Sequence, residues 1–477
     1  MREDVSGWTI HGLSKRIAAK EISPVEVTEA LIRRIETYGP KLKSFITLDA
    51  EGALAEARQA EEEILKGNYR GPLHGIPLAY KDLFATKGLK TTSGSKIFKD
   101  HVPTEDSTVV ARLRQAGAVC LGKLNMSEFA FGATGHNSHY GNCRNPWAME
   151  HVAGGSSSGS GNAVAAGLVM GALGSDTGGS VRMPSCACGI VGLKPTYGRL
   201  SRRGVTPLSW SLDHVGPMTR CVEDSAIMLK AMAGRDPLDP TTSDLPVPDY
   251  PSALTGEIRG LRLGVPSNYF FEAIDPEVKD CVRKAISSLE RLGARVEEVT
   301  YPHPQESVMH GLVIMMAESA SVHSRLLKDR ASDYDPRARA LLTAGLYVTA
   351  TDYLQALRVR ARIARDVVRE VFGRVEVLLA PTLPIPAPRL DTSQVTLGGE
   401  KQEVQWVMPK LTRLSNMVGN PSVTVPCGLS SKGLPIGLQV MGRRFDEANM
   451  LRVAHAWEVH GTWKDLRPTA YSDGGAG

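Results

Sequence analysis

The sequence predicts an α/β protein in which a large mixed β-sheet is covered by helices on both faces. Helical patterns fill most of residues 10–65, near the start of the chain. Short β-rich stretches at 76–80, 118–121 and 190–193 then alternate with helical patterns. Strands that alternate with helices are typical of a sheet packed between two helical layers.

Three helices are expected at the N-terminal end. The first covers about residues 10–20, and the third covers 50–65, where charged residues on one side oppose Ala and Leu on the other. The second begins at Ser23-Pro24 and runs to about Tyr38. Serine is a good N-cap, and proline is favoured at the first helical position.

The second half of the chain repeats the strand–helix–strand pattern at 261–265, 277–292 and 295–299. A mostly helical section follows near 305–371. We expect a single domain, residues 1–477, in which this helical section shapes the substrate pocket. Strand character returns afterwards at 375–379, 422–425 and 436–441.

Charge and hydropathy argue against several classes of protein. The formal net charge is +5, and no run of five or six basic residues occurs. The arginines between Arg358 and Arg369 are interspersed with acids, which is typical of a solvated helix face rather than a nucleic-acid patch. The N-terminus has no apolar signal stretch, and no window approaches eighteen unbroken apolar residues. We therefore expect a cytoplasmic protein without membrane contact.

The seven cysteines predict free thiols. Their number is odd and no C-x-x-C motif is present, so a disulfide framework is not indicated in a chain of this length. Cys186 and Cys188 are close in sequence, but no Cys or His nearby supplies further ligands. The sequence therefore predicts no metal site.

Two tracts rich in glycine and serine stand out. Residues 154–161 precede a helical pattern at 163–170, and hydroxyls with bare amides at a helix start suit anions or polarised oxygens. A flexible linker is the alternative, but apolar patterns flank the tract closely. Residues 174–182 place two glycines before Ser180, so several N–H groups could hold an oxyanion beside a nucleophile. Taken alone, a tight turn explains this second tract equally well.

A lysine follows an apolar run that is typical of a buried strand. Lys81 comes directly after GIPLAY, residues 75–80. Burying an ammonium is unfavourable, so this lysine needs a partner or a lowered pKa. A surface ion pair with Asp82 is the simpler interpretation for a lone lysine at a strand end.

Together these three segments resemble the amidase signature family. The family's hallmarks are a G-G-S-S-(S/G)-G-S tract, a D-T-G-G-S-(I/V)-R turn and an earlier lysine in G-(I/V)-P-x-x-x-K-D. This chain carries GGSSSGS, DTGGSVR and GIPLAYKD. The resemblance extends from about residue 8 to residue 460, and further similar stretches lie at 125–129, 189–199 and 437–439.

The resemblance implies a Ser-Ser-Lys catalytic triad. Ser180 corresponds to the nucleophile, and Ser156 to a bridging serine that the family holds on a cis peptide. Lys81 corresponds to the base, which acts as a neutral amine, so its pKa must fall from about 10.4 towards 7–8. The oxyanion would be held by the backbone N–H groups of Thr177, Gly178, Gly179 and Ser180.

The same resemblance implies supporting and substrate-binding residues. Asp176 and Arg182 are expected to hold the turn by hydrogen bonds, and Ser157 to orient Lys81 or Ser156. The expected substrate-binding residues are Met126, Phe129 and Gly155, with Phe131 as a further candidate; a core role is an equal alternative for Met126, Phe129 and Phe131. The chain departs from the family pattern at Ala187, Tyr80 and Leu83.

A second serine motif competes with this interpretation. Residues 155–159 match G-x-S-x-G, which would make Ser157 the nucleophile of an α/β-hydrolase esterase, with Asp213 and His214 as its partners. Two adjacent residues can hardly orient one another as the acid and base of a triad. We therefore disfavour the esterase.

The predicted function is hydrolysis of a carboxamide or a related C–N bond through an acyl-enzyme. Anilides, carbamates (urethanes) and esters are included, and no cofactor is expected. The predicted partner is a small-molecule amide-type substrate, with no nucleic acid, no membrane and a possible homodimer. The alternative is the glutaminase A subunit of a glutamyl-tRNA amidotransferase complex, although residues 208–220 look closer to free-standing amidases. A catalytically dead interaction protein is disfavoured because all three triad positions are filled.

Overall fold

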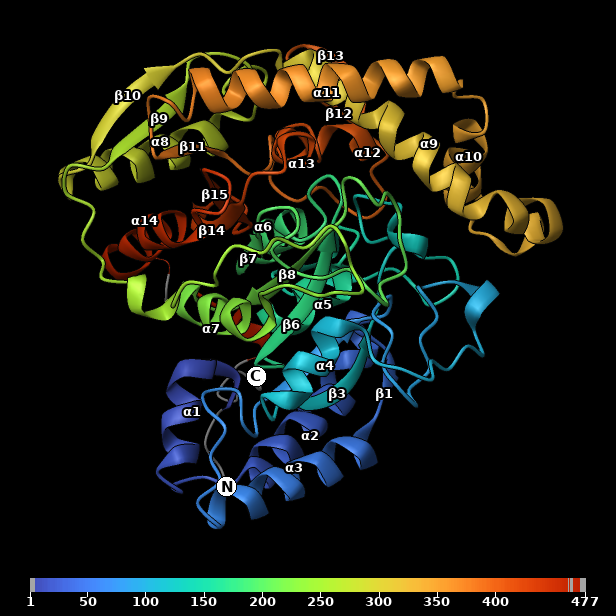
Figure 1. Cartoon of the computed structure of the whole chain (residues 1–477), viewed down its shortest axis with the longest axis vertical. Helices are drawn as coiled ribbons and strands as arrows, with labels where there is room; N and C mark the ends of the chain where they lie inside the picture. The colour runs from blue at the N-terminus through green and yellow to red at the C-terminus, as the bar shows by residue number, and fades with distance from the viewer. Residues whose placement is uncertain (1–4, 462, 464–465, 472–477) are drawn as a thin grey trace.

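The computed structural model describes residues 5–461, 463 and 466–471. Its centre is a mixed sheet of eleven strands, which runs diagonally through the molecule in Figure 1. The strand order is β1-β3-β2-β6-β8-β7-β14-β15-β11-β9-β10. Helices cover both faces, so the predicted α/β class with a large mixed sheet is confirmed.

The sheet has parallel pairs on either side of an antiparallel centre, and its edge strand β1 pairs antiparallel with β3. β2 pairs in parallel with β3 and β6, and β9 pairs in parallel with β10 and β11, whereas the strands from β6 to β11 pair antiparallel. The strands are β1 (Phe45–Leu48), β2 (Pro77–Lys81), β3 (Val119–Leu124), β6 (Gly171–Asp176), β7 (Val191–Lys194), β8 (His214–Thr219), β9 (Arg262–Pro266), β10 (Arg295–Val299), β11 (Val377–Pro381), β14 (Ser422–Leu429) and β15 (Pro435–Gly442).

The N-terminal helices begin where their capping residues predict. α2 (Pro24–Leu42) starts with a capping box in which the Ser23 hydroxyl accepts from Val25 N, while the Glu26 side chain accepts from Ser23 N. α1 covers Ile10–Ala18 and α3 covers Ala50–Leu65, as predicted within two residues. These helices form the lower part of the molecule in Figure 1.

Opposite faces of β6 contact different helices. A side chain at Gly171 would meet Met228 of α7 (Val222–Met232), whereas one at Gly174 would meet Ser157, directly before α5 (Ser158–Ala165). Positions three apart in a strand point to opposite faces. The sheet is therefore packed between helical layers. The remaining sheet-associated helices are α4 (Thr108–Gln115), α6 (Arg182–Cys188), α8 (Pro276–Arg291) and α14 (Glu447–His460).

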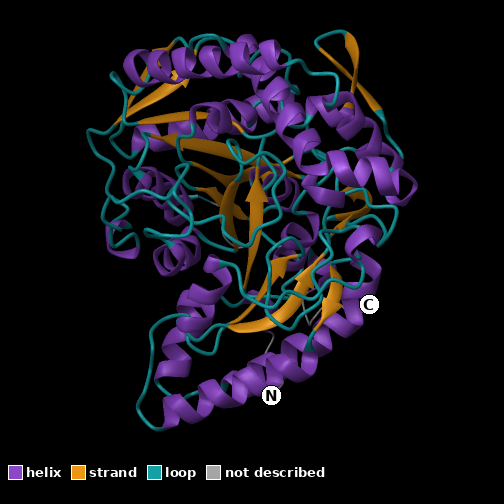
Figure 2. Cartoon of the chain, turned by 45° about the vertical axis from the view of Figure 1, so that its right-hand side comes forward, coloured by secondary structure: helices purple, strands orange, loops and turns teal. Residues whose placement is uncertain are grey.

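The helical section expected near 305–371 consists of three helices. α9 (Pro304–Arg330), α10 (Pro336–Gly345) and α11 (Ala350–Glu370) pack together, and α9 and α11 also contact α13 (Arg413–Val418). Figures 1 and 2 show this section as a cap on the upper side of the molecule. Two small hairpins, β4–β5 (Arg144–Asn145, Ala148–Val152) and β12–β13 (Gln394–Leu397, Glu400–Glu403), and the short helix α12 (Val404–Val407) complete the fold.

Two local expectations need correction. The helix expected at 163–170 is α5, which covers Ser158–Ala165 and therefore contains serines of the tract itself. Small residues allow this position, because any side chain at Gly159 would collide with the backbone of Ser44 and Asn125. β6 (GALGSD) was not predicted, because a strand with two glycines and no β-branched residue lacks the usual strand signal.

One hydrophobic cluster runs from Val5 to Tyr471 through the centre of the molecule. All seven cysteines are free, as the sequence predicts. In the part of the chain that the structure describes, no helix combines the length and apolar character needed to cross a bilayer.

Candidate active site

The amine of Lys81 lies in the interior at the end of β2. Lys81 is fully buried, and its Nζ lies 2.7 Å from Ser156 Oγ and 2.9 Å from Ser175 Oγ. Burial lowers the pKa of Lys81 to about 7, although the charges of Asp213 and Asp176 oppose this shift. A surface ion pair with Asp82 is therefore not formed. At neutral pH a substantial fraction of this amine is uncharged and can accept a proton.

The segments that carry the two predicted catalytic serines are in direct contact. Ser156 follows a cis peptide bond after Gly155, and Ser157 N donates to Ser180 O at 3.2 Å. Ser180 is 7% exposed, whereas Ser156 is fully buried. The fold thus brings Lys81 and Ser156 into contact and places the backbone of Ser180 against that of Ser157, at the edge of a cavity.

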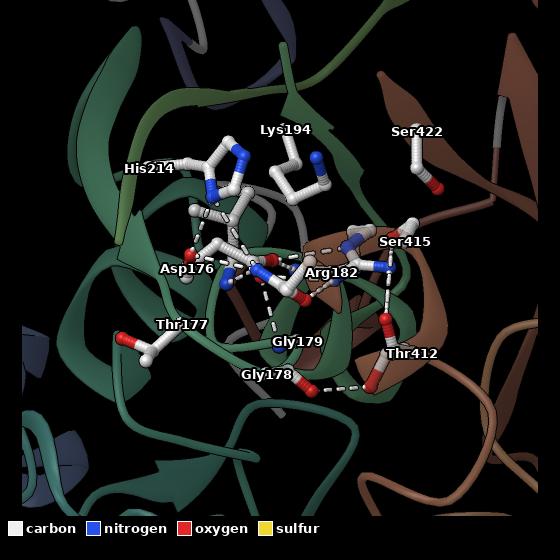
Figure 3. A network of polar contacts seen from close by, with 12 residues as sticks. Asp176, Thr177, Gly178, Gly179, Arg182, Lys194, His214, Thr412, Ser415 and Ser422 are labelled. Carbon is white, nitrogen blue, oxygen red and sulfur yellow. Dashed lines mark hydrogen bonds and ion pairs between the residues drawn. The ribbon is translucent and has the colours of Figure 1, made fainter. Parts of the chain in front are cut away.

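An ion pair holds the turn that contains Ser180. Both oxygens of Asp176 accept hydrogen bonds from the Arg182 guanidinium, at 3.0 and 2.9 Å, and both residues are fully buried. Burial alone would raise the pKa of Asp176, but the charge and hydrogen bonds of Arg182 lower it below its usual range. Figure 3 shows the pair with Thr412 and Ser415 alongside. Arg182 also donates to Thr412 O, Ser415 Oγ, Asn416 Oδ1 and Gln439 Oε1.

The turn from Thr177 to Ser180 is held from three sides. Gly179 N donates to Asp176 Oδ1 at 2.8 Å, so this predicted oxyanion donor is already engaged. Thr412 Oγ1 donates to Gly178 O at 2.7 Å, a contact visible in Figure 3. Thr177 Oγ1 donates to Asp213 Oδ1 at 2.6 Å. These contacts leave the N–H groups of Thr177, Gly178 and Ser180 as the remaining candidates for an oxyanion.

Sequence reasoning gave no role to Ser175, a residue of the second tract that contacts both Lys81 and Ser157. Ser157 was expected to orient Lys81 or Ser156, but its Oγ bonds to the backbone of Ser175, at 3.2 Å to the oxygen and 3.3 Å to the nitrogen. It is the Ser175 hydroxyl that contacts Lys81. Little in the sequence indicated this contact, because Ser175 is a single serine in β6, a strand that was not predicted.

The esterase alternative lacks its serine–histidine contact. Ser157 is fully buried and bonded to Ser175, whereas His214 Nδ1 lies 2.7 Å from Leu212 O. Asp213 accepts from Thr177 Oγ1 and from two backbone N–H groups, at Leu208 and Ser209. Burial raises the pKa of Asp213 to about 6. Asp213 therefore supports the turn before Ser180, a role that its sequence position did not reveal.

Two cavities that share lining residues lie on the side of the molecule where Ser180 is found, and they are called here the inner and the outer cavity. The inner one, about 30 Å³, is lined by Ser180, Thr177 and Gly178 and by Met315 of α9. The outer one, about 410 Å³, shares Phe131, Gly132 and Gln405 with it and reaches α10 and the β12–β13 hairpin. The helical section thus contributes side chains to both.

The expected substrate-binding residues lie in different surroundings. Phe131 lines both cavities, whereas Met126 and Phe129 are fully packed in the core and line neither. Phe129 stacks edge-on against His323 with ring centroids 4.4 Å apart. Gly155 is enclosed by the backbone of residues 132–135, so a side chain there would collide.

The departures from the family pattern are all buried. Ala187 packs in a small cluster with Met183, Leu383 and Met408, so neighbouring side chains occupy the space beside it. Tyr80 and Leu83 belong to the main core. Nothing in their surroundings explains why these residue types occur.

Within the described residues, no group of three or more His, Cys, Asp or Glu side chains is arranged to hold a metal ion.

The comparisons with known proteins agree on one family. Residues 26–451 match the Amidase family. The A subunit of the glutamyl-tRNA(Gln) amidotransferase of Geobacter metallireducens is 42% identical over 95% of this chain and 97% of that protein. An s-triazine catabolic enzyme, solved with an inhibitor in a vestigial protein complex, has a TM-score of 0.91 at 36% identity, over 95% of this chain and 98% of that one. A bacterial aryl acylamidase has a TM-score of 0.89 at 27% identity, over 98% of both chains.

These relatives correct one prediction. We expected only a small-molecule substrate, no nucleic acid and at most a homodimer. The curated relatives are subunits of an enzyme named for glutamyl-tRNA(Gln), which contradicts that expectation. The error has a physical reason. A missing basic patch describes only this chain's own surface, whereas one protein of a complex can meet nucleic acid through the other chains.

The shared architecture and the match over nearly the whole sequence lead to one conclusion: this chain belongs to the amidase signature family.

Proposed function

We propose that this chain hydrolyses a carboxamide through an acyl-enzyme on Ser180, with Ser156 as proton relay and Lys81 as base. The observation that carries the proposal is the buried Lys81 amine, bonded to Ser156 and Ser175 and with its pKa lowered to about 7. Such an amine can accept a proton at neutral pH without a histidine.

The proposed reaction relays a proton from Ser180 through Ser156 to Lys81. Ser156 gives its proton to neutral Lys81 and takes that of Ser180, while Ser180 Oγ attacks the carbonyl carbon. The oxyanion forms at the turn after β6, where the N–H groups of Thr177, Gly178 and Ser180 are the candidate donors. The proton returns through Ser156 to the leaving nitrogen, the C–N bond breaks, and water then hydrolyses the ester on Ser180.

For the substrate, we favour the side-chain amide of glutamine, with the chain acting as a glutaminase subunit beside partner proteins. Identity of 42% over 95% of the chain to the A subunit of an amidotransferase supports this choice. The s-triazine enzyme, also solved in a protein complex, is a second similar protein with a partner.

The second candidate is a free-standing amidase for anilides, carbamates or esters. The specific observation in its favour is the backbone similarity to the aryl acylamidase, with a TM-score of 0.89 over 98% of both chains. The two candidates share the same chemistry and differ in leaving group and in their need for partners.

One experiment separates them. The chain is purified alone and, separately, by a tag from its native host with whatever proteins copurify. Both preparations are assayed for ammonia release from glutamine and for cleavage of an anilide, a carbamate and an ester. The glutaminase predicts glutamine turnover that rises at least tenfold in the copurified sample, whereas strong anilide cleavage by the isolated chain favours the second candidate. Ser180→Ala should lower every activity by about 10⁴-fold or more, and full activity in this variant would refute the proposed chemistry.

A further inference from the structure

The guanidinium of Arg413 has no counter-charge in the wall of the inner cavity. Arg413 begins α13 and is half-buried. It is the one charged residue among those that line the cavity at Ser180, where its neighbours are apolar, hydroxyl or amide side chains and glycines. Among the described residues its side chain makes no hydrogen bond or ion pair, and its contacts are with Trp406 and Gly178.

The side chain of Arg413 lies beside the turn that carries Ser180. A Cβ placed on Gly178 would lie 3.2 Å from Arg413 Cγ and 3.6 Å from Nε. The guanidinium carbon lies 5.3 Å from the centre of the Trp406 ring, which lines the outer cavity. Arg413 therefore extends from the turn of Ser180 towards the passage between the two cavities.

Two other arginines, the fully buried Arg182 and the half-buried Arg112, are compensated. Arg182 pairs with Asp176, and Arg112 donates to three backbone oxygens. Among the residues that the structure describes, the group beside Arg413 that could carry a negative charge is Tyr269, but burial raises the pKa of that phenol to about 12, so it is neutral at pH 7. Burial also lowers the pKa of Arg413 to about 10. A partly desolvated cation without an anionic partner is unfavourable, and an anion that enters the cavity would relieve this.

We propose that Arg413 is a specificity-determining residue that binds a carboxylate on the acyl part of the substrate. A guanidinium matches a carboxylate through two parallel hydrogen bonds, and the low polarity of the cavity strengthens them. The preferred substrates are therefore amides whose acyl group ends in a carboxylate. This inference rests on the proposed amide hydrolysis and narrows its substrate class; glutamine meets the requirement, and simple anilides do not.

The test uses two amides of the same shape. Succinamate carries a carboxylate, and 4-methylpentanamide carries an isopropyl group in its place. The ratio of their kcat/KM values is measured for the wild-type protein, Arg413→Lys and Arg413→Met, in the chain with its copurified proteins. We expect Arg413→Met to lower the ratio by about 10- to 100-fold, mainly through the KM for succinamate. For Arg413→Lys we expect a ratio between those of the wild-type protein and Arg413→Met, because lysine keeps the charge but cannot form the two parallel hydrogen bonds of a guanidinium.

A neighbouring arginine supplies the matched control. Arg337 lines the outer cavity, is exposed and shares that wall with Glu128, Asp335, Asp391 and Glu403. Arg337→Met should change the ratio by less than about threefold. An equal fall for both amides in Arg413→Met, or a larger effect of Arg337→Met, would overturn the inference.

A binding measurement separates this inference from the proposed reaction. Succinate binding to Ser180→Ala and to the double variant with Arg413→Met is measured by calorimetry. Binding that weakens about 10- to 100-fold in the double variant supports the carboxylate site even if the wild-type protein cleaves neither amide, in which case the proposed hydrolysis fails alone. Equal binding by the two variants overturns the carboxylate site even if both amides are cleaved.

Discussion

Two buried lysines on neighbouring strands make an instructive comparison. Lys81 ends β2 and Lys123 lies in β3, and Tyr80 is paired with Lys123 across the parallel ladder. Both amines are fully buried, and burial lowers their pKa values to about 7 and about 8. Their partners differ, because Lys81 contacts two serine hydroxyls, whereas Lys123 contacts the backbone oxygen of Phe84 and two threonine hydroxyls. The carboxylate of Asp82 is near enough to oppose the lowering of the Lys123 pKa.

A lowered pKa therefore does not by itself identify a catalytic base. A carbonyl oxygen only accepts hydrogen bonds, so Phe84 O requires an N–H group from Lys123. The two threonine hydroxyls beside Lys123 already donate to backbone oxygens, so they offer no proton to the lone pair of a neutral amine. A hydroxyl can donate as well as accept, so Lys81 can exchange a proton with Ser156. The comparison assigns Lys123 to stability and Lys81 to chemistry, and the predictions below test this division.

The largest expected effect is on turnover. Lys81→Met should lower kcat by about 10²- to 10⁴-fold, the usual contribution of a positioned general base. Lys123→Met, the same change one strand away, should lower kcat by less than about tenfold. Steady-state assays with the best substrate of the panel test this pair, and similar losses in both variants would remove the distinction.

The next effect is on stability, and here we expect Lys123→Met to cause the larger loss and Lys81→Met the smaller one. Lys123→Met removes a buried donor from the backbone oxygen of Phe84 and from two threonine hydroxyls, so it should lower the free energy of unfolding by about 1–3 kcal/mol. Lys81→Met leaves only hydroxyls that can reorient and removes a buried amine, so the change should stay within about 1 kcal/mol. Denaturant unfolding measures both, and a larger loss for Lys81→Met would contradict the assignment.

The pH dependence follows from the pKa of Lys81. The active form is the neutral amine, and the folded pKa is about 7, so activity is lost as pH falls below 7. We expect kcat/KM to rise nearly tenfold per pH unit below pH 7 and to level off above it. Lys123→Met should keep this profile. A flat profile from pH 5 to 9 with chemistry rate-limiting would exclude Lys81 as the base.

The smallest effect concerns the second hydroxyl at Lys81. Ser175→Ala removes the 2.9 Å contact to Nζ and should lower kcat by about 2- to 12-fold, the range of one ordinary hydrogen bond. Ser44→Ala is the matched control, because Ser44 is a buried serine whose hydroxyl has no hydrogen-bond partner among the described residues. An unchanged kcat in Ser175→Ala would mean that Ser156 alone positions the amine.

Local sequence signals predicted the N-terminal helices well. The capping box at Ser23 and the amphipathic pattern of 50–65 depend on residues three or four positions apart, so they can be recognised within one segment. β6 was missed because its glycines carry no strand signal, although the sheet requires a strand between β2 and β8. Surrounding strands imposed the conformation there.

The three motifs in the sequence were enough to identify the family and to name Lys81, Ser156 and Ser180 as a group, because each motif is contiguous. The second hydroxyl beside Lys81, that of Ser175, could not be predicted, since this contact joins residues 94 positions apart. The same holds for Arg413, which reaches Gly178 only through the folding of the C-terminal part against the turn after β6. Contacts of this kind depend on packing between distant segments, and packing has no signature in a single stretch of sequence.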